Sequence, residues 1–576
     1  MSAQEEGGLP FQKPCDALLH AARIHPDRPF LRVLPETAGI YGIEARSHTY
    51  AQTAERVEAL KHWYEAAGIG HGHRVGLMLQ NRPGFFFNWL ALNALGASVV
   101  PLSTEWRATE LEYVVGHSEL CMAVVQPNRV AELEAAAESL SRSVSVTTER
   151  ELEEGAAGRH RRVTEAAARI AGVPDIHTEC ALLYTSGTTG RPKGCILPNE
   201  YFIQAGHWYA TIGGACTVRP GEERMLTPLP TAHMNAMACS TMCMLMTGGC
   251  LIALDRFHAS TWWQSVRESQ ATIVHYLGVM PAMLMSAPPL PSDQDHQVRF
   301  GFGAGVNPKL HAPFEERFGF PLLEAWAMTE TGSGAVVIAN RESRHVGTAC
   351  FGRAEHRVEY RLVDDEGKDV PVGVPGELLV RGRGANPRFG FFAGYLKDAA
   401  ATDESWRGGF FHTGDVVRAD AEGNLFFVDR KKNVIRRSGE NISAVEVESA
   451  LIRHPGVRSV GVAAVPDAIR GDEVLACVVL KDAPGEGGHR ATAQGGVASP
   501  QASSSVHEAL AQELVRFALS QIAYFKVPGY VVFCDALPLT ATEKIQRAEL
   551  RALAVKSLEA GDAIDTRALK KRDVAA

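Results

Sequence analysis

Hydrophobic and polar positions in the first part of the chain alternate between a helical period and short apolar runs. Residues 51–67 have the spacing of an amphipathic helix, and RVGLML at 74–79 is typical of a buried strand. The same pair follows again, with FFFNWLALNALGA (85–97) as a helix and SVVPL (98–102) as a strand. Because strand–helix–strand alternation favours parallel sheets covered by helices, the pattern predicts an α/β fold.

The pattern changes toward the C-terminus. From about residue 358 to 430, short apolar segments are separated by Gly, Pro and Asp, which is typical of antiparallel strands and turns. Beyond that region, SVGVAAVPD and EVLACVVLKD indicate strands, and residues 506–522 indicate a helix. We therefore expect a large N-terminal domain (1–431) of parallel α/β sheets with a β-rich module, and a small α+β C-terminal domain (432–556).

Two segments are predicted to lie outside the packed cores. Residues 482–505 are rich in Gly, Ala, Ser and Pro, and strand and helix patterns of the small domain flank them on both sides. They are interpreted as a flexible surface insertion. The charged stretch 557–576 is expected to be a mobile tail.

Composition narrows the class of protein. The chain has 576 residues, 45% of them hydrophobic, so it can bury sizeable cores. A formal net charge of -8 argues against a nucleic-acid partner, which usually requires a basic surface. The 11 cysteines include no CxxC pair, which disfavours a zinc or disulfide framework and indicates a reducing, cytoplasmic location. The N-terminus starts acidic and lacks the apolar core of a secretory signal.

One uncharged stretch resembles a membrane span in composition only. From Met225 to Leu254 there is no Asp, Glu, Lys or Arg, but Pro228, Pro230 and the pair Gly248-Gly249 interrupt it. A lipid-exposed helix of about 20 residues rarely tolerates that pattern. We therefore predict a buried loop, helix and strand here, and no integral membrane span.

Residues 181–197, ALLYTSGTTGRPKGCIL, join an apolar strand to a turn rich in glycine and hydroxyl groups. Glycine lets backbone N–H groups converge on an anion without Cβ clashes, and the hydroxyls and a lysine add donors and charge. The frame is not that of a Walker loop, and an ordinary polar hairpin turn is the alternative. The candidate phosphate-binding residues are Thr185, Ser186, Gly187, Thr188, Thr189, Gly190 and Lys193.

The segment YTSGTTGRPKG resembles the signature of the adenylate-forming superfamily, which includes acyl-CoA synthetases, carrier-protein adenylation domains and beetle luciferases. The resemblance covers about residues 50 to 550. In DRKKNVIRRSGENIS and FKVPGYVVF the chain is most similar to the crotonobetaine/carnitine-CoA ligase branch. The resemblance implies that the small domain is mobile and rotates between two half-reactions.

The segment LLEAWAMTETG (322–332) matches a family motif that binds the nucleotide. The resemblance implies that Trp326 stacks on adenine, Thr329 contacts the α-phosphate and Glu330 binds Mg²⁺. The family usually has Tyr or Phe followed by Gly, whereas this chain has Trp326 followed by Ala327. Tryptophan still offers a π-face. A core aromatic and a helix-capping acid are the alternatives.

Three further segments resemble motifs of the same superfamily and supply candidate nucleotide-binding, hinge and CoA-binding residues. FGFGAGVNPKL matches the adenine-side loop, and FHTGDVV matches the segment whose acid binds the ribose hydroxyls. VDRKKNVIRRSGENIS matches a second ribose contact, the interdomain hinge, and backbone near the pantetheine arm of CoA. Plain turns and a solvated basic face are the alternatives. The residues are Gly303, Ala304 and Gly305 in the first segment, Asp415 in the second, and Arg430, Lys432 and Gly439 in the third.

Two more candidates concern the acid itself. LPLTATEKIQRAEL contains Lys544, which the resemblance implies bridges the substrate carboxylate and the α-phosphate. The family often has Gly before this lysine, whereas this chain has Glu543. PLPTAHMNAM places His233 where the family lines the acyl site, although a structural histidine is the alternative.

Together the motifs predict an ATP-dependent acyl-CoA ligase. A carboxylic acid attacks the α-phosphate of MgATP to give acyl-AMP and pyrophosphate, and the CoA thiol then gives the thioester and AMP. The alternatives are a free-standing ligase that loads a carrier protein, a luciferase-like oxygenase and a non-catalytic nucleotide sensor.

The acid (carnitine-like, medium-chain or aromatic) and the oligomeric state, a homodimer included, stay open. A quaternary ammonium substrate prefers aromatic faces. The candidates for such faces are Trp208, Tyr209, Trp262, Trp263 and Trp326.

Overall fold

The computed structural model describes residues 9–153, 168–185, 192–430, 434–481, 504–539 and 545–571. The backbone divides into two units with separate hydrophobic cores. Unit 1 contains Met1–Thr104, Glu112–Tyr184 and Gly194–Lys431, and unit 2 contains Glu105–Leu111, Thr185–Lys193 and Lys432–Ala576. The described residues form a multi-sheet α/β arrangement in unit 1 and an α+β arrangement in unit 2, which confirms the predicted fold class.

The described strands of unit 1 form three sheets, which include the end residues Thr185 of β7 and Lys193 of β8. The seven-stranded sheet has the order β18 (Gly394–Tyr395), β8 (Lys193–Pro198), β7 (Glu179–Thr185), β4 (Ser98–Pro101), β3 (Arg74–Met78), β5 (Met122–Val125) and β6 (Ser145–Thr148). The eight-stranded sheet has the order β14 (Val337–Ile338), β13 (Leu322–Trp326), β12 (Phe300–Ala304), β11 (Ile273–Leu277), β9 (Arg224–Thr227), β10 (Cys250–Ala253), β1 (Pro29–Arg32) and β2 (Ser47–Thr49).

The third sheet is antiparallel throughout and corresponds to the predicted β-rich module. Its order is β15 (Cys350–Arg353), β20 (Asn424–Arg430), β19 (Phe411–Ala419), β17 (Gly376–Gly382) and β16 (Val358–Val363). In the two larger sheets most neighbouring strands run parallel, as the strand–helix–strand pattern requires.

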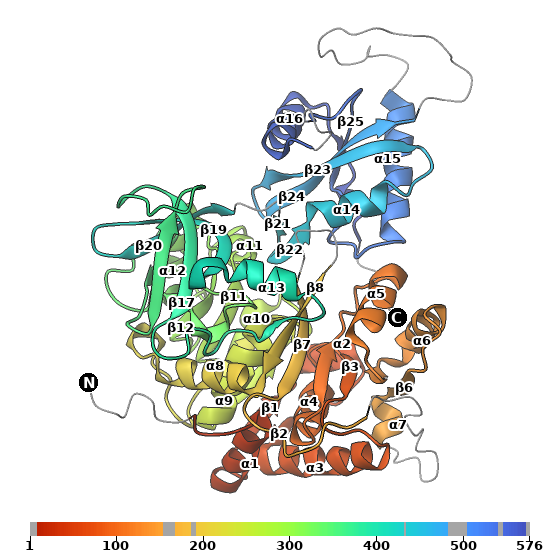
Figure 1. Cartoon of the computed structure of the whole chain (residues 1–576). Coiled ribbons are helices and arrows are strands. Elements are labelled where there is room, and N and C mark those ends of the chain that lie inside the picture. Colours follow the sequence, from red (N-terminus) through yellow and green to blue (C-terminus); the bar gives the residue numbers. More distant parts are fainter. Residues whose placement is uncertain are drawn as a thin grey trace. The chain divides into compact units, whose positions relative to one another are not determined.

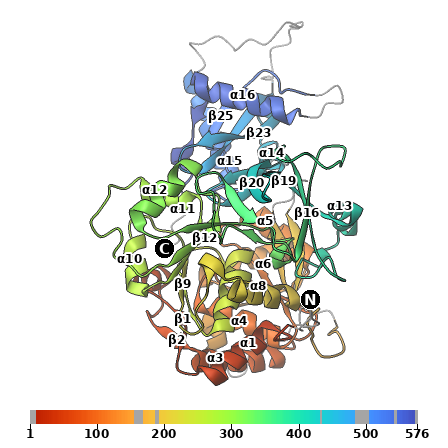
Figure 2. The ribbon, with the colours of Figure 1, turned by 90° about the vertical axis from the view of Figure 1, so that its left-hand side faces the viewer.

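Helices connect and cover these strands. The predicted helices are α3 (Tyr50–Ala66) and α4 (Pro83–Ala94), and Figures 1 and 2 show both beside α1 (Pro14–Ile24). Thr49 and Gln52 form a reciprocal capping box at the start of α3. Proline stands in the first turn of α4, where its missing N–H costs nothing. Further helices are α5 (Ala108–Ser118), α8 (Asn199–Thr211), α9 (Met242–Thr247), α10 (Trp262–Ser269), α11 (Val279–Met285), α12 (Pro308–Phe318) and α13 (Ala399–Ser405).

The uncharged stretch from Met225 to Leu254 lies inside unit 1, as predicted. It contains most of β9, a π-helical segment at Asn235–Thr241, helix α9 and strand β10. Nearly all of its apolar side chains are buried in the protein core. None of the described helices combines the length and the apolar composition that crossing a bilayer requires.

The sheet of unit 2 has a helical layer on each face. Its order is β22 (Glu440–Ser443), β21 (Val434–Arg437), β24 (Gly471–Leu480), β25 (Tyr530–Phe533) and β26 (Ile564–Asp565), with β23 (Val457–Asp467) also paired to β24. One face packs on α14 (Ala444–Leu451) and α15 (Ser504–Leu519), and the other on α16 (Arg547–Ala560). Figure 1 shows α15 and α16 on opposite sides of these strands.

The prediction of a mobile tail is wrong for residues 557–571, which are folded onto unit 2. Helix α16 continues to Ala560, β26 pairs antiparallel with β25, and the side chain of Lys570 is buried. The apolar residues of this segment, Leu558, Ile564 and Leu569, pack on the cores of unit 2, and they are too widely spaced to predict a strand. The predicted insertion at 482–505 lies outside the described residues except for the start of α15.

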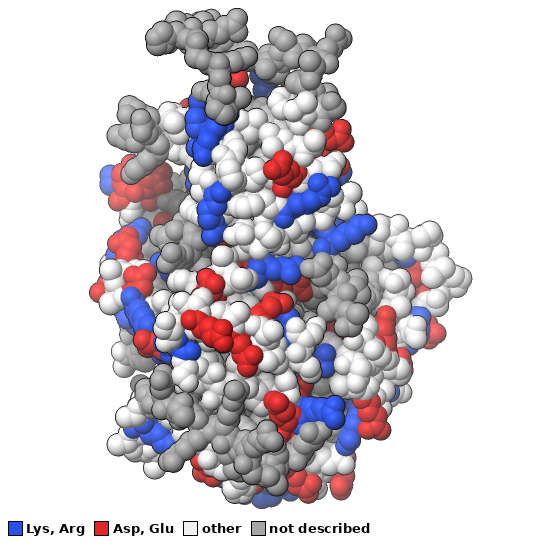
Figure 3. Space-filling view, turned by 90° about the vertical axis from the view of Figure 1, so that its right-hand side faces the viewer, with Lys and Arg blue, Asp and Glu red and all other residues white. Residues whose placement is uncertain are grey.

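Charges are mixed on the face shown in Figure 3. Among the residues coloured there, basic and acidic side chains are interspersed and neither sign covers a large area. This view therefore shows no basic stripe of the kind that follows a nucleic-acid backbone.

Candidate functional site

The candidate site of unit 1 begins where three parallel strands end side by side. Strands β11, β12 and β13 are neighbours in register, with Leu277 opposite Ala304 and Gly303 opposite Glu324. The last residue of β13 is Trp326. Ligands of open α/β sheets bind at the carboxyl ends of strands. The structure therefore brings the predicted residues Gly303, Ala304 and Trp326 to one sheet edge.

A buried glutamate that sequence reasoning missed shapes this edge. The carboxylate of Glu324 accepts hydrogen bonds from the backbone N–H groups of Gly305 (2.9 Å) and Val306 (3.1 Å) and from the hydroxyl of Tyr276 (2.9 Å). Burial raises the pKa of Glu324 despite these donors. Glu324 therefore fixes the turn that carries Gly305. An acidic residue inside the apolar run LLEAW was the available signal.

Glycine is required in this loop by protein neighbours. A Cβ on Gly303 would lie 2.2 Å from the backbone oxygen of Tyr276, and one on Gly278 would lie 1.6 Å from that of Gly305. Gly305 itself has φ +79°, a conformation that residues with a side chain disfavour. The small residues here thus allow two strand ends to approach each other closely.

Trp326 and Asp415 are in direct contact although they are 89 residues apart in the chain. The indole Nε1–H of Trp326 donates to Asp415 Oδ2 at 2.9 Å, and the two residues are only 6% and 1% exposed. Asp415 lies on β19, where its backbone faces Arg430 on the neighbouring strand β20. The predicted adenine-stacking residue and the two predicted ribose-binding residues therefore meet in unit 1.

Glu330 contacts β18, a short strand that pairs with the strand following the glycine-rich turn. The hydroxyl of Tyr395 donates to Glu330 Oε1 at 3.0 Å, and the N–H of Phe392 donates to the Glu330 backbone oxygen at 3.0 Å. Tyr395 belongs to β18, which pairs with β8 opposite Cys195. Burial, and then the nearby carboxylate, raises the pKa of Tyr395, so its hydroxyl stays a donor. Sequence reasoning missed Tyr395.

Thr329 is fixed through its backbone. Its carbonyl oxygen accepts a hydrogen bond from the Tyr201 hydroxyl of α8 at 2.9 Å. Gly332 follows closely, and a Cβ there would lie 2.3 Å from the ring of Tyr201 and 2.4 Å from the Gly390 oxygen. The segment that carries Thr329 and Glu330 therefore packs tightly against α8.

The glycine-rich turn is described only at its ends. Thr185 is the last residue of β7 and Lys193 the first of β8, and these strands are neighbours in the sheet. The remaining predicted phosphate-binding residues (Ser186, Gly187, Thr188, Thr189 and Gly190), together with Lys432 and Lys544, lie outside the described residues, and so does the side chain of Arg430.

In unit 2, Gly439 lies in the turn of the β21–β22 hairpin. Gly439 has φ 88° and the preceding Ser438 has φ 51°. Arg437 and Glu440 pair across the end of the hairpin. Two consecutive residues with positive φ form a tight turn of the kind found in two-residue hairpins.

The predicted histidine is exposed, and a different one is buried. His233 lies on the bend before the π-helical segment. His275, in the middle of β11, is fully buried and contacts the Tyr209 hydroxyl at 2.9 Å, Ser240 Oγ at 3.0 Å and Asn235 Oδ1 at 2.6 Å. Burial lowers its pKa to about 3, so the imidazole is neutral. A π-helical segment often marks a functional site.

The candidate aromatic residues for a quaternary ammonium do not form one cage. Tyr209 stacks on Phe302 with ring centroids 4.7 Å apart, and Trp208 lies next to both. Trp263 instead stacks on Phe318, 4.5 Å away, in a second core that also holds Trp262. Trp326 is the one of the five that contacts Asp415 among the described contacts.

Glu330 fits a magnesium ion that arrives with a nucleotide. Mg²⁺ in nucleotide sites is usually held by one or two carboxylates together with phosphate oxygens and water. Glu330 is 7% exposed, and Tyr395 orients one of its oxygens. Among the described residues no group of three or more His, Cys, Asp or Glu could hold a metal ion by itself. The donor set therefore suits a metal that phosphate groups also bind.

Comparisons with known proteins agree with this geometry. Residues 18–396 match the family model for the AMP-binding enzyme, and residues 446–544 match that for the AMP-binding enzyme C-terminal domain. The crotonobetaine/carnitine–CoA ligases of Shigella flexneri and Escherichia coli (strain SE11) are each 28% identical to the chain over 513 residues, which cover 88% of this chain and 93% of the relative.

Two solved structures show the same fold. The amide bond synthetase McbA from Marinactinospora thermotolerans has a TM-score of 0.75 and 23% identity, with 94% of this chain and 100% of that chain covered. A double mutant of o-succinylbenzoate CoA synthetase from Bacillus subtilis, bound to a product analogue, has a TM-score of 0.74 and 23% identity, with 93% and 97% covered.

Proposed function

Because the chain belongs to the AMP-binding enzyme family, we propose that it is an ATP-dependent acyl-CoA ligase. It activates a carboxylic acid as acyl-AMP with release of pyrophosphate, and then transfers the acyl group to CoA with release of AMP. The observation that carries the proposal is the contact between Trp326 and Asp415 at the strand ends of unit 1. It joins an aromatic face, which can stack on a base, and a carboxylate, which can accept the ribose hydroxyls.

We assign the nucleotide to this pair and to the loop beside it. The indole face stacks on adenine beside Gly303, Ala304 and Gly305, and Asp415 accepts the ribose hydroxyls. The indole N–H occupies one carboxylate oxygen of Asp415 and so orients the other toward the ribose. This is a contact that tyrosine or phenylalanine at position 326 would not provide with the same geometry.

The acid is activated by positioning and charge stabilisation. A carboxylate is a poor acyl donor, because its leaving group would be oxide, and AMP is a better one. Bound Mg²⁺ supplies charge neutralisation on the triphosphate, and Glu330 is the residue that holds it. The turn at 185–193 binds phosphate oxygens, Thr329 contacts the α-phosphate, and Lys544 bridges it to the acid.

The second half-reaction uses unit 2. The proposed hinge is Lys432, and the Ser438–Gly439 turn lies beside the pantetheine arm of CoA. Lys544 and Gly439 therefore serve different steps, and the small domain rotates between them, a motion that can limit turnover. His233, being exposed, is proposed to line the acyl entrance only.

The proposed compartment is the cytoplasm. All of the cysteines, each of them described, are free thiols, which suits a reducing environment. The acid is proposed only as a class: a small carboxylic acid that ends near the neutral polar cluster around His275.

A direct assay tests the proposal. The full chain is incubated with ATP, Mg²⁺ and CoA, and with crotonobetaine, carnitine, o-succinylbenzoate, anthranilate or fatty acids of several lengths. Pyrophosphate release and thioester formation are measured, and parallel reactions replace CoA by an amine or by a phosphopantetheinylated carrier protein. At least one acid should give pyrophosphate and, with CoA, a thioester. Thioester on the carrier alone, or amide in place of thioester, would show that the acceptor is assigned wrongly.

A further inference from the structure

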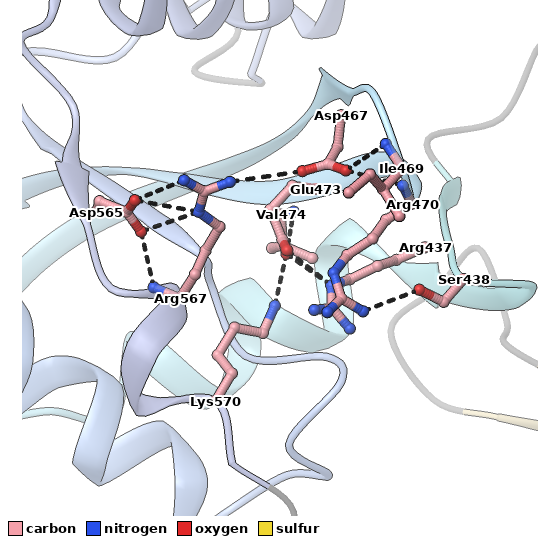
Figure 4. A network of polar contacts seen from close by, with 10 residues as sticks. All are labelled: Arg437, Ser438, Asp467, Ile469, Arg470, Glu473, Val474, Asp565, Arg567 and Lys570. Carbon is pink, nitrogen blue, oxygen red and sulfur yellow. Dashed lines mark hydrogen bonds and ion pairs between the residues drawn. The ribbon is translucent and has the colours of Figure 1, made fainter. Parts of the chain in front are cut away.

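A buried ionic cluster in unit 2 joins the end of the described chain to the β21–β22 hairpin (Figure 4). Glu473, on β24, accepts hydrogen bonds from Arg437 Nε at 2.9 and 2.8 Å and from Lys570 Nζ at 2.5 Å. The side chains of Glu473, Arg437 and Lys570 are 0%, 6% and 1% exposed. One carboxylate therefore binds two cations, one from the hairpin and one from the C-terminal segment.

The backbone fixes both the carboxylate and the C-terminal segment. A Cβ on Gly529 would lie 2.6 Å from the carboxyl carbon of Glu473, so glycine is needed to leave room for it. The N–H of Thr566 donates to the Gly529 oxygen at 2.9 Å, and its hydroxyl donates to the Pro528 oxygen at 3.0 Å. The segment that carries Lys570 is thus hydrogen-bonded to Pro528 and Gly529, beside the Glu473 carboxylate.

Arg437 immediately precedes the Ser438–Gly439 turn. Ser438 has φ 51°, which is uncommon for a residue with a side chain and costs free energy. Its N–H donates to the Arg470 oxygen at 2.9 Å, and Arg470 Nη1 donates to its Oγ at 3.3 Å. A strained turn persists only when its surroundings fix it. The fixed points are Arg470 on one side and the Arg437–Glu473 pair on the other.

Charge supports the same connection. Burial, and then the neighbouring Arg437, lowers the pKa of Lys570 to about 7, while Glu473 opposes that shift. Burial alone would raise the pKa of Glu473, but Lys570 and Arg437 lower it. The charged groups that face the Lys570 amine are Arg437 on β21, Glu473 on β24 and Arg470 before β24. Near neutral pH, the second cation of the cluster is therefore close to losing its proton.

We propose that Lys570 is a positioning residue that, through Glu473 and Arg437, holds the Ser438–Gly439 turn in the conformation needed for acyl transfer to CoA. The functional part rests on the proposed function, which gives this turn its role at the pantetheine arm. Lys570 lies beyond residue 544, where the match to the family's C-terminal domain ends. The residue that supports the turn therefore lies outside the part of the chain that the family model matches.

A second ionic contact of the same segment provides a matched control. Arg567 bonds Asp565 at 2.7 Å and lies 3.7 Å from Asp467, but its side chain is 44% exposed. Exposed ion pairs contribute little to stability. Arg567→Met therefore removes from the same short segment a cation that has no direct contact with Glu473, Arg437 or the turn among the described contacts. Its described link to the turn is indirect, through Asp467, which accepts a hydrogen bond from the Arg470 N–H.

The test compares Lys570→Met with Arg567→Met in the full chain. Amide hydrogen exchange in residues 434–443 reports the hairpin, and the two half-reactions are followed separately with the best acid of the panel above. Lys570→Met should speed exchange in the hairpin and slow transfer from acyl-AMP to CoA by roughly 10-fold, the scale of a small misplacement, with pyrophosphate exchange changed less than about 2-fold. Arg567→Met should change none of these.

Each other outcome overturns the proposal or one part of it. Unchanged hairpin exchange in Lys570→Met refutes the structural connection, whether or not the wild type is a CoA ligase. Equal loss of both half-reactions, or unchanged transfer with a loosened hairpin, refutes the positioning role. Wild-type protein that forms acyl-AMP but never a thioester refutes the proposed function instead.

Lys570→Arg allows a comparison of the pH dependence of acyl transfer, which would not change if Lys570 had only a structural role. Arginine keeps its charge throughout. As pH rises from about 6 to about 9, wild-type Lys570 loses its proton, so the ratio of wild-type to Lys570→Arg transfer rates should fall through pH 7. Ionisation of the CoA thiol affects both proteins equally and cancels. A flat ratio contradicts the proposal.

Discussion

Two buried glutamates, Glu324 in unit 1 and Glu473 in unit 2, are held in opposite ways. Glu324 accepts only neutral donors in its described contacts, namely two backbone N–H groups and the Tyr276 hydroxyl. Glu473 accepts from the cations of Arg437 and Lys570. Burial therefore raises the pKa of Glu324, whereas the two cations lower that of Glu473 against the same effect of burial.

The difference shows how each unit builds its functional segment. At the strand ends of unit 1, the buried Glu324 binds the backbone N–H groups of the loop and a hydroxyl of a neighbouring strand, so the geometry follows from the sheet itself. In unit 2, charged side chains from three separate segments fix a strained turn, so the geometry depends on side chains that can be neutralised or removed. The first kind of site is rigid, and the second kind is open to change by pH and by substitution.

The largest effect is expected at Glu473. Glu473→Gln leaves Arg437 and Lys570 buried without their carboxylate, and breaking a buried pair in this way costs about 3–5 kcal/mol. Urea unfolding, read by hydrogen exchange within unit 2, measures the loss. Glu324→Gln is the matched substitution in unit 1 and should cost less, about 1–3 kcal/mol, because only neutral hydrogen bonds are disturbed. Equal costs would mean that the two carboxylates are not held differently.

Lys544→Ala should separate the two half-reactions. If Lys544 bridges the acid and the α-phosphate, its loss lowers acid-dependent pyrophosphate exchange on the order of 10²-fold or more, the scale of one preorganised donor. Thioester formation from supplied acyl-AMP should be spared, which is the reverse of the Lys570→Met pattern. Normal pyrophosphate exchange in the variant would remove Lys544 from the mechanism.

Trp326→Phe tests the hydrogen bond that the Trp326 indole N–H donates to the Asp415 carboxylate. Phenylalanine keeps an aromatic face for adenine but lacks the N–H that orients the carboxylate. One hydrogen bond to a charged group contributes about 1.5–3 kcal/mol, so KM for ATP should rise roughly 10-fold or more with a smaller change in kcat. Trp326→Leu, which removes the face as well, should be worse. If the two variants bind ATP equally well, stacking makes no contribution.

Sequence patterns identified the parts of the molecule that local rules determine. The alternation of helices and strands predicted α3, β3, α4 and β4, and the motifs predicted Trp326, Glu330 and Asp415 as one group. The structure places Trp326 against Asp415, and Glu330 against Tyr395 of β18, which pairs with the strand that leaves the glycine-rich turn. These residues lie in motifs long enough to be recognised individually.

The residues that support the site could not be predicted in the same way. Tyr395 contacts Glu330 across 65 residues of chain, and Lys570 contacts Glu473 across 97. Neither pair has a local spacing that indicates contact. The C-terminal segment was expected to be mobile because its sequence is charged, yet a short strand pair, two hydrogen bonds of Thr566 and the buried ammonium group of Lys570 help to hold it. Such contacts depend on tertiary packing, which periodicity does not encode.

The smallest expected effect is a difference in the sign of the pH dependence of stability, and it follows from the two opposite pKa shifts. Because the pKa of Glu324 is raised in the folded state, its contribution to stability is full at low pH and is lost as pH rises from its ordinary value, near 4.5, through the raised one. Because the pKa of Glu473 is lowered, its contribution is present above the ordinary value, near 4.5, and is lost as pH falls.

Relative to wild type, Glu324→Gln should therefore gain stability as pH rises, and Glu473→Gln should lose it. Each slope stays below about 1.4 kcal/mol per pH unit, the limit for one proton. Urea unfolding at several pH values between about 4 and 7 measures both slopes. Slopes of the same sign would mean that the Arg437 and Lys570 cations lower the pKa of Glu473 by less than burial raises it. The two glutamates would then not differ in the direction of their pKa shifts, and the contrast between the two units would be wrong.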